Sequence, residues 1–408
     1  MSVEFRAIAE QEREECLALW CTVWPGENSR SYFRRYFYGD VEWLPYYTQV
    51  AVVDGKLVSA VQICKRSVAC GEFQLTMGGI ANVATLPEFR GRGYNTECMQ
   101  QAIQVMEADA MDFSLLFTGI NAYYARLGYE TLPRRQLSGT IRADLVPPSS
   151  DVTVRRATDD DLPLIRSIYD AYNAQRPIAV QRSDAYWRDW IGIAPGQVPE
   201  TLFVAVSPAG EVCGYIRTGV FNSAIPYSAE EAGVRIIELG ASSRHSDEER
   251  AVTCALLAEV AHRMTEAGIR KLRLDIALEK AVMEALDALL EDRQEHFARS
   301  GMVRVLHRES LLRSFTMPLN GRWIGAGRPE GEAAFGTPYG SVRLDANGPF
   351  LRAMPDETKL DDLPQSALFG LLFGALDREP AADSTSQTTL LETLFPAHPW
   401  IYWGADGF

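Results

Sequence analysis

The residues best suited to chemistry form a short glycine-containing turn, Arg90-Gly91-Arg92-Gly93-Tyr94-Asn95. An apolar strand, Gly79 to Leu86, is predicted before it, and a helix, Tyr94 to Ala108, after it. Glycine backbone N–H groups, the positive end of the helix and the Arg90 and Arg92 side chains can together hold phosphate oxygens. The turn therefore predicts a site for a diphosphate-bearing cofactor, and the alternative is an ordinary surface turn.

The elements that must position this turn occur twice along the chain. In the first copy, a strand and a helix precede a hairpin at Asp54-Gly55, and the strand, turn, helix and a further strand follow. The same order starts again at Val152-Thr153-Val154-Arg155, which corresponds to Val3-Glu4-Phe5-Arg6. We interpret this as a weak internal repeat of one mixed α/β unit.

The second copy lacks an equivalent phosphate turn. Its counterpart, Ser242 to Asp247, has no glycine and is followed by Glu248 and Glu249, which repel phosphate. We therefore expect only the first copy to bind the cofactor. A Pro- and Ser-rich linker near Leu145 to Asp151, and a less distinct boundary near Ser300 after a helical stretch, predict three domains. Their expected ranges are residues 1–146, 151–300 and 301–408.

Bulk composition excludes several classes of protein. Hydrophobic residues make up 47% of the chain and charged residues 23%, as in folded domains, and a net charge of -14 disfavours nucleic acid as a ligand. No apolar run approaches the roughly 20 residues that cross a bilayer, and the N-terminus has no secretory pattern. The seven cysteines are odd in number and irregularly spaced, and the five histidines form no cluster, so neither a disulfide framework nor a metal is expected. These features predict a cytoplasmic protein.

The turn resembles motif A of the GNAT acetyltransferases, in which Arg/Gln-x-x-Gly-x-Gly/Ala binds the pyrophosphate of coenzyme A. Arg90 and Gly93 match that motif, and Asn95 departs from its final Gly/Ala. Tyr123-Tyr124-Ala125-Arg126-Leu127-Gly128-Tyr129 is similar to the GNAT segment after the fifth strand. With a second GNAT-like unit and an aromatic C-terminus, the chain resembles the enhanced intracellular survival (Eis) type.

This resemblance implies a fold class of α/β (α+β): two tandem GNAT-like mixed-sheet domains and a sterol-carrier-protein-like α+β domain. It also implies an N-acetyltransferase with acetyl-CoA as co-substrate. In the family, a tyrosine matching Tyr124 is the general acid, and the terminal carboxylate, here that of Phe408, is the general base. The matching cofactor-binding residues are Val83, Ala84, Thr85, Arg90, Gly91, Arg92, Gly93, Tyr94, Asn95 and Thr96.

Chemistry gives both catalytic roles an independent reason. An amine of pKa near 10 must lose a proton before it attacks a thioester, and the departing thiolate needs a proton that a tyrosine can supply. The alternatives are that Tyr124 is a packed core tyrosine and that Phe408 is a frayed end. The apolar run Trp400-Ile401-Tyr402-Trp403 favours a docked end, since exposing each side chain would cost roughly 2 kcal/mol.

The acceptor stays open between aminoglycoside, polyamine and protein lysine. Glu27, Asp40 and Glu42 are candidates to attract a cationic acceptor, and solvated surface charges are the alternative. The resemblance implies a homo-oligomer, often a hexamer built from trimers. Two other functions stay open: an acyltransferase that uses a longer acyl donor, and a carrier protein that uses an apolar cavity in the last domain.

Overall fold

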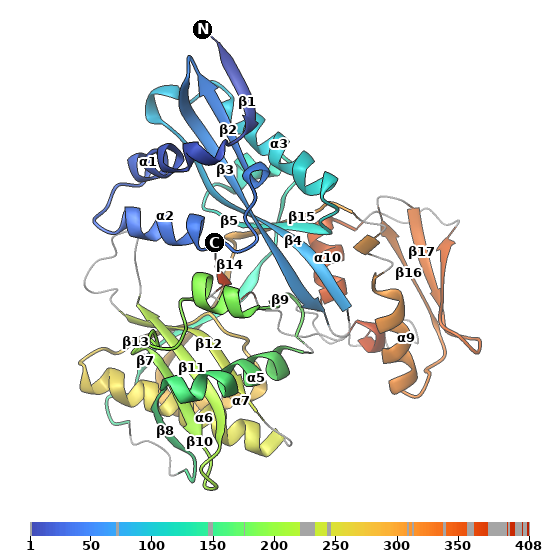
Figure 1. Cartoon of the computed structure of the whole chain (residues 1–408). Coiled ribbons are helices and arrows are strands. Elements are labelled where there is room, and N and C mark those ends of the chain that lie inside the picture. The colour runs from blue at the N-terminus through green and yellow to red at the C-terminus, as the bar shows by residue number, and fades with distance from the viewer. Residues whose placement is uncertain are drawn as a thin grey trace.

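The described residues of the chain form three β-sheets with helices packed on them, as a computed structural model shows (Figure 1). The structure describes residues 2–407 with a set of gaps, which are 71–72, 146–149, 175, 221–232, 243–245, 308–309, 312–313, 338–339, 357–362, 374–389, 391, 396–401 and 403–405. Its mixed sheets agree with the predicted fold class.

The first sheet has eight strands among the described residues, in the order β1-β2-β3-β4-β5-β15-β6, with β9 paired to β3. Helices α1 and α3 contact this sheet, and α2 packs on α1. The strands are β1 Val3–Ala7, β2 Thr48–Val53, β3 Lys56–Cys70, β4 Phe73–Thr85, β5 Phe113–Phe117, β6 Glu130–Thr131, β9 Ala179–Val180 and β15 Gly301–Val305. The helices are α1 Arg13–Val23, α2 Ser29–Tyr38, α3 Tyr94–Ala108 and α4 Asn121–Ala125, with short η1 Glu10–Glu12, η2 Pro45–Tyr47 and η3 Pro87–Phe89.

The second sheet has seven strands among the described residues, in the order β14-β7-β13-β12-β11-β10-β8. Its strands are β7 Arg134–Ile141, β8 Thr153–Arg156, β10 Leu202–Val206, β11 Val212–Val220, β12 Gly233–Ala241, β13 Lys271–Leu274 and β14 Leu290–Ala298. Its helical segments are η4 Asp159–Asp161, α5 Leu162–Asn173, η5 Tyr186–Ile191, α6 Ser246–Glu266 and α7 Lys280–Leu289. Helices α5 and α6 both pack on β11 and β12.

The third unit is smaller. Its described strands form the antiparallel sheet β16-β17-β18, and α10 packs on β15 of the first sheet. The elements are β16 Glu332–Thr337, β17 Gly340–Asp345, β18 Arg352–Asp356, α9 Thr316–Gly325 and α10 Gln365–Phe373. The sequence predicts two helices in this unit, Leu363 to Leu376 and Ser386 to Leu394. The first corresponds to α10, whereas most of the second lies outside the described residues.

The internal repeat is present in the element order. The first unit runs β1, α1, β2, β3, β4, α3, β5 and the second runs β8, α5, β10, β11, β12, α6, β13. Residues Asp54 and Gly55 form the predicted hairpin turn, with φ values of 48 and 82. Helix α3 has the predicted bounds, and β4 begins earlier than predicted. Local apolar periodicity was therefore sufficient to find these elements.

The two large units exchange strands. Strand β7 lies between β13 and β14 in the second sheet, although it precedes the predicted linker. Strand β15 lies between β5 and β6 in the first sheet, although it follows both repeats. The predicted ranges 1–146, 151–300 and 301–408 stay predictions, and each large sheet contains strands from outside its range.

Candidate active site

The predicted phosphate turn connects β4 to α3. Gly91 and Gly93 have φ values of 75 and 82, a left-handed conformation that side chains disfavour, and Gly93 caps the first turn of α3. An added Cβ at either glycine would meet nothing within 4 Å, so the requirement for glycine comes from the backbone. The turn therefore leaves open space in front of the helix N-terminus, where an anion is favoured.

A cavity of about 640 Å³ opens beside this turn. The predicted residues that line it are Val83, Ala84, Thr85, Arg90, Gly91, Gly93, Tyr94, Asn95, Thr96 and Tyr124. Arg92 does not line the cavity: it is exposed, and its guanidinium lies 5.4 Å from the Phe89 ring centroid. The lining residues that sequence reasoning missed are Val23, Trp24, Phe89, Ile120, Tyr123 and Arg126.

The cavity forms where two parallel strands separate. The pairing of β4 with β5 runs from Met77↔Phe113 to Ile80↔Leu116. Two residues later, Asn82 has a φ of 51, and the β3–β4 register shifts between Ala60 and Gln62. The bulge and the end of pairing leave the last residues of β4, Val83 to Thr85, on the wall of the cavity.

Tyr124 comes from α4, directly after β5, and is 6% exposed. Its ring lies edge-on to Tyr123 at 4.9 Å and to Tyr129 at 6.2 Å. Burial raises the pKa of the Tyr124 hydroxyl to about 12. Tyr124 is therefore packed in a core and also lines the cavity, so the two interpretations of this residue are compatible, and its hydroxyl keeps its proton at neutral pH.

Asn95, the departure from motif A, has partners of its own. Its Oδ1 accepts a hydrogen bond of 2.8 Å from the Tyr123 hydroxyl, and its Nδ2 donates to Ser59 Oγ at 3.4 Å. Ser59 in turn donates to the Ala84 carbonyl at 2.9 Å and lies 2.8 Å from Thr85 Oγ1. The amide thus connects the tyrosine pair to the cofactor-facing end of β4. No local sequence pattern indicates this contact, because it joins residues 28 positions apart.

The charged residues considered for the site differ in setting, and Glu27, Asp40 and Glu42 are not among the residues that line the cavity. Arg90 and Arg126 line it and are exposed, which suits contact with phosphate. Asp40 is not a solvated charge, because its carboxylate is buried and accepts a 2.8 Å bond from the buried Arg66. Glu27 and Glu42 are exposed. Of the three acidic residues considered for the acceptor, Asp40 is already paired within the protein.

The described part of the C-terminal segment contacts the end of β5. Phe408 lies outside the described residues, as do Trp400, Ile401 and Trp403. Tyr402 is 2% exposed, and its ring lies 6.0 Å from that of Phe117, the last residue of β5. Ile120, three residues further along, lines the cavity. The docking expected for the aromatic run is thus found at Tyr402.

Three further expectations can be compared with the described residues. In that part of the chain, no helix is long and apolar enough to cross a membrane, and no three His, Cys, Asp or Glu residues gather as metal ligands would. The second-copy counterpart of the turn is Ser242 to Asp247. Its positions 243–245 lie outside the described residues, and its last residue, Asp247, is exposed.

The combination of a split β4–β5 pair, a glycine turn at the α3 N-terminus and a buried tyrosine after β5 defines an acetyltransferase fold. Residues 4–132 match the family model described as an acetyltransferase (GNAT) domain. N-alpha-acetyltransferase 30 of Schizosaccharomyces pombe is 33% identical over 122 residues, covering 28% of this chain and 77% of that protein. The chain therefore belongs to the GNAT acetyltransferases and is an N-acetyltransferase.

Solved structures are similar over the whole chain. A GCN5-related N-acetyltransferase from Kribbella flavida has a TM-score of 0.66 and 18% identity, covering 100% of this chain and 98% of that one. Eis1 from Mycobacterium abscessus has a TM-score of 0.59 and 15% identity, covering 100% of both chains. At these identities, the likeness shows a shared fold.

Proposed function

We propose that this chain transfers an acetyl group from acetyl-CoA to a primary amine of a small cationic acceptor, such as an aminoglycoside-like compound, a polyamine or lysine. The observation that carries the proposal is a convergence. The phosphate turn, the end of β4 and Tyr124 all line one cavity of about 640 Å³, large enough for part of a nucleotide-linked thioester. Each of these three elements was predicted from the sequence as part of the same active site.

The residues of the turn suit the diphosphate of acetyl-CoA, which would supply an activated thioester. Gly91 and Gly93 leave space for backbone N–H groups to reach phosphate oxygens, and Arg90 and Arg126 would neutralise their charge. We propose Arg92, Tyr94, Asn95 and Thr96 as further parts of this site. Backbone groups of Val83 to Thr85 would orient the pantetheine arm and polarise the carbonyl.

Two proton transfers complete the proposed reaction. The terminal carboxylate of Phe408 would accept a proton from the amine, which frees its lone pair for attack. The Tyr124 hydroxyl would give its proton to the departing sulfur. Burial raises the pKa of Tyr124 to about 12, so its hydroxyl is protonated at neutral pH and has a proton to donate to the departing sulfur. The contact of Tyr402 with Phe117 supports the role of Phe408, because it places a residue of the tail at the end of β5, three residues before the cavity residue Ile120.

We further propose the Eis type, with two tandem GNAT domains and a sterol-carrier-protein-like last domain. The full-length likeness to Eis1 and the repeated element order support this assignment. A homo-oligomer, such as a hexamer built from trimers, and a cytoplasmic location follow from the same assignment. The six cysteines that the structure describes as free thiols agree with that location.

Calorimetric titration with acetyl-CoA tests the proposal without knowledge of the acceptor. We expect one site per chain, followed by acetyl transfer in a screen of aminoglycosides, polyamines and lysine peptides. Two sites per chain would contradict a single cofactor turn. An absence of binding would reject the proposal and favour the alternative of a carrier protein with an apolar cavity in its last domain. Tighter binding of a longer acyl-CoA would indicate another acyl donor.

A further inference from the structure

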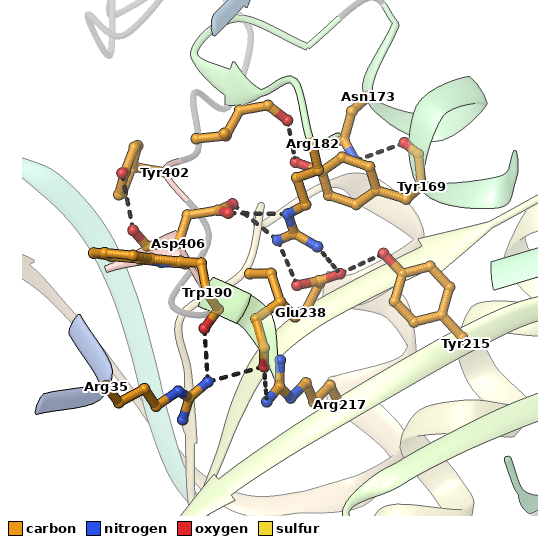
Figure 2. Close-up of polar contacts among 12 residues, drawn as sticks. Arg35, Tyr169, Asn173, Arg182, Trp190, Tyr215, Arg217, Glu238, Tyr402 and Asp406 are labelled. Atoms are coloured by element: carbon orange, nitrogen blue, oxygen red, sulfur yellow. Dashed lines mark hydrogen bonds and ion pairs between the residues drawn. The ribbon is translucent and has the colours of Figure 1, made fainter. Parts of the chain in front are cut away.

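Arg182 holds the C-terminal segment through a buried ion-pair cluster (Figure 2). Its Nε and Nη2 atoms both donate to the Asp406 carboxylate at 2.9 Å. Its Nη1 and Nη2 atoms donate to the Glu238 carboxylate at 2.9 and 2.8 Å. One guanidinium thus binds two carboxylates in a forked geometry, which fixes its orientation.

The surroundings leave this cluster no exposure to water. The Arg182 and Asp406 side chains are 0% exposed, and that of Glu238 is 1% exposed. The rings of Tyr169 and Trp187 lie 3.9 and 4.5 Å from the guanidinium carbon, so it is also held from its faces. Burying such charges seldom adds stability by itself, whereas removing one partner is costly. The cluster is therefore better suited to fixing one arrangement of the tail than to stabilising the fold.

A second contact joins the tail to the first unit. The Tyr402 hydroxyl donates to the Asp406 carbonyl oxygen at 2.9 Å, which links these two residues of the tail. The Tyr402 ring packs on Phe117 at the end of β5. Arg182 lies two residues after β9, which pairs with the C-terminal end of β3, and Glu238 lies on β12. The tail is consequently held between both large units.

We infer that Arg182 is a positioning residue for the terminal carboxylate. By binding Asp406, it fixes where the chain end lies. This inference rests on the proposed function, in which that carboxylate is the base. Asp406 stands two residues before the chain end, and each extended residue advances at most about 3.6 Å, so a fixed Asp406 limits the end to a small volume. Glu238 and Tyr215, whose hydroxyl donates to Glu238 at 2.6 Å, hold the guanidinium ready for the tail.

Asp406→Asn is the decisive variant, because it keeps the size of the side chain and removes its charge. The control is Asp161→Asn, which breaks another Arg–Asp pair with a buried carboxylate, that of Asp161 with the half-exposed Arg155 in the second unit. Two quantities are measured on the full chain. One is the rate at which carboxypeptidase A releases Phe408 from the folded protein, followed by intact mass, and the other is the pair kcat and KM for acetyl-CoA.

We expect Asp406→Asn to raise the release rate and to lower kcat by about tenfold or more each, with KM within about twofold. Asp161→Asn should change neither quantity. An unchanged release rate for Asp406→Asn would overturn the inference. Faster release of Phe408 with unchanged kcat would mean that Arg182 positions the tail but that the terminal carboxylate is not the base. That result would overturn the inferred catalytic purpose of Arg182. If Asp406→Asn does not fold, Tyr402→Phe is measured in its place. It removes the hydrogen bond from the Tyr402 hydroxyl to Asp406, so it must also speed the release of Phe408.

Discussion

The Tyr123 hydroxyl donates a 2.8 Å hydrogen bond to Oδ1 of Asn95 across the cavity. This contact joins the last residue of the phosphate turn to the tyrosine beside Tyr124. It explains how the chain accommodates asparagine where the family motif has Gly or Ala: the side chain points to a partner and connects two walls of the site.

A double-mutant cycle measures this link. Asn95→Ala and Tyr123→Phe each remove the same bond, so their effects on the free energy of unfolding should be less than additive by about 0.5–1.5 kcal/mol. Urea denaturation of the two single variants and the double variant gives the value. Additive effects would show that the bond contributes nothing to stability.

Gly93→Ala tests whether the turn binds phosphate. Gly55, in the β2–β3 hairpin, offers a matched control, since both glycines have a φ of 82 and both leave space for a Cβ. Each substitution should cost about 1–2 kcal/mol of stability, because alanine disfavours this conformation. Only Gly93→Ala should weaken acetyl-CoA binding in calorimetry, by about tenfold or more. Equal affinities for the two variants would contradict a phosphate site at the turn.

Tyr124→Phe should lower kcat by about 10²–10⁴ and leave the acetyl-CoA Kd nearly unchanged, because the lost hydroxyl acts on the leaving group. Tyr123→Phe removes a neighbouring hydroxyl and should have a much smaller effect on kcat. A loss of affinity in step with the loss of kcat would instead assign Tyr124 to binding.

The pH profile tests the same residue in the unmodified enzyme. Burial raises the pKa of Tyr124 to about 12, so the acid stays protonated well above the ordinary tyrosine pKa of about 10. The rate should therefore rise as the amine loses its proton and show no decline near pH 10. The same shift means that folding favours the neutral tyrosine, so its contribution to stability is lost as the pH rises from about 10 to about 12. A decline in rate centred near pH 10, without unfolding by circular dichroism, would argue against Tyr124 as the acid.

Extension of the chain by one residue beyond Phe408 moves the terminal carboxylate without changing any internal side chain. We expect kcat to fall by about 10²-fold or more while acetyl-CoA affinity is kept, because a displaced base cannot reach the amine. Steady-state kinetics and calorimetry on the same preparation separate the two effects. Undiminished turnover would exclude this base.

Asp40→Asn should destabilise the fold by about 3–5 kcal/mol, since it leaves the Arg66 guanidinium buried without its counter-ion. The two side chains are 1% and 0% exposed. The exposed Glu42 provides the comparison, and Glu42→Gln should change stability by less than about 0.5 kcal/mol. Chemical denaturation measures both, and similar stabilities would mean that the Arg66 charge is compensated elsewhere.

Features encoded over short stretches could be predicted from the sequence. The phosphate turn, α3 and the Asp54-Gly55 hairpin depend on periodicity and glycine placement within a few residues. The link between Asn95 and Tyr123 requires two segments to meet in space, and no local pattern encodes that approach. Arg182 was equally hidden, because its partners Glu238 and Asp406 are 56 and 224 residues away in the chain.

The sequence also did not predict which strands belong to which sheet, and some elements were missed. Strand β14 lies at the edge of its sheet with most side chains exposed, so it lacks the alternation of buried and exposed residues that identifies a strand. Helix α2 was missed as well, because its aromatic and arginine residues gave no clear signal. Assignment of β7 and β15 to sheets on the other side of the linker depends on pairing, which periodicity does not report.

The exchange of β7 and β15 also matters for synthesis of the protein. The ribosome completes β5 long before it reaches β15, and at about 5–20 residues per second the delay between them is roughly 10–40 s. During that time the β5 edge that will receive β15 has no strand beside it, and β6 has no partner in this sheet. The nascent enzyme must therefore keep an open, apolar sheet edge from aggregating until its second half has been made, and a gene shortened to the first GNAT unit would leave that edge open permanently.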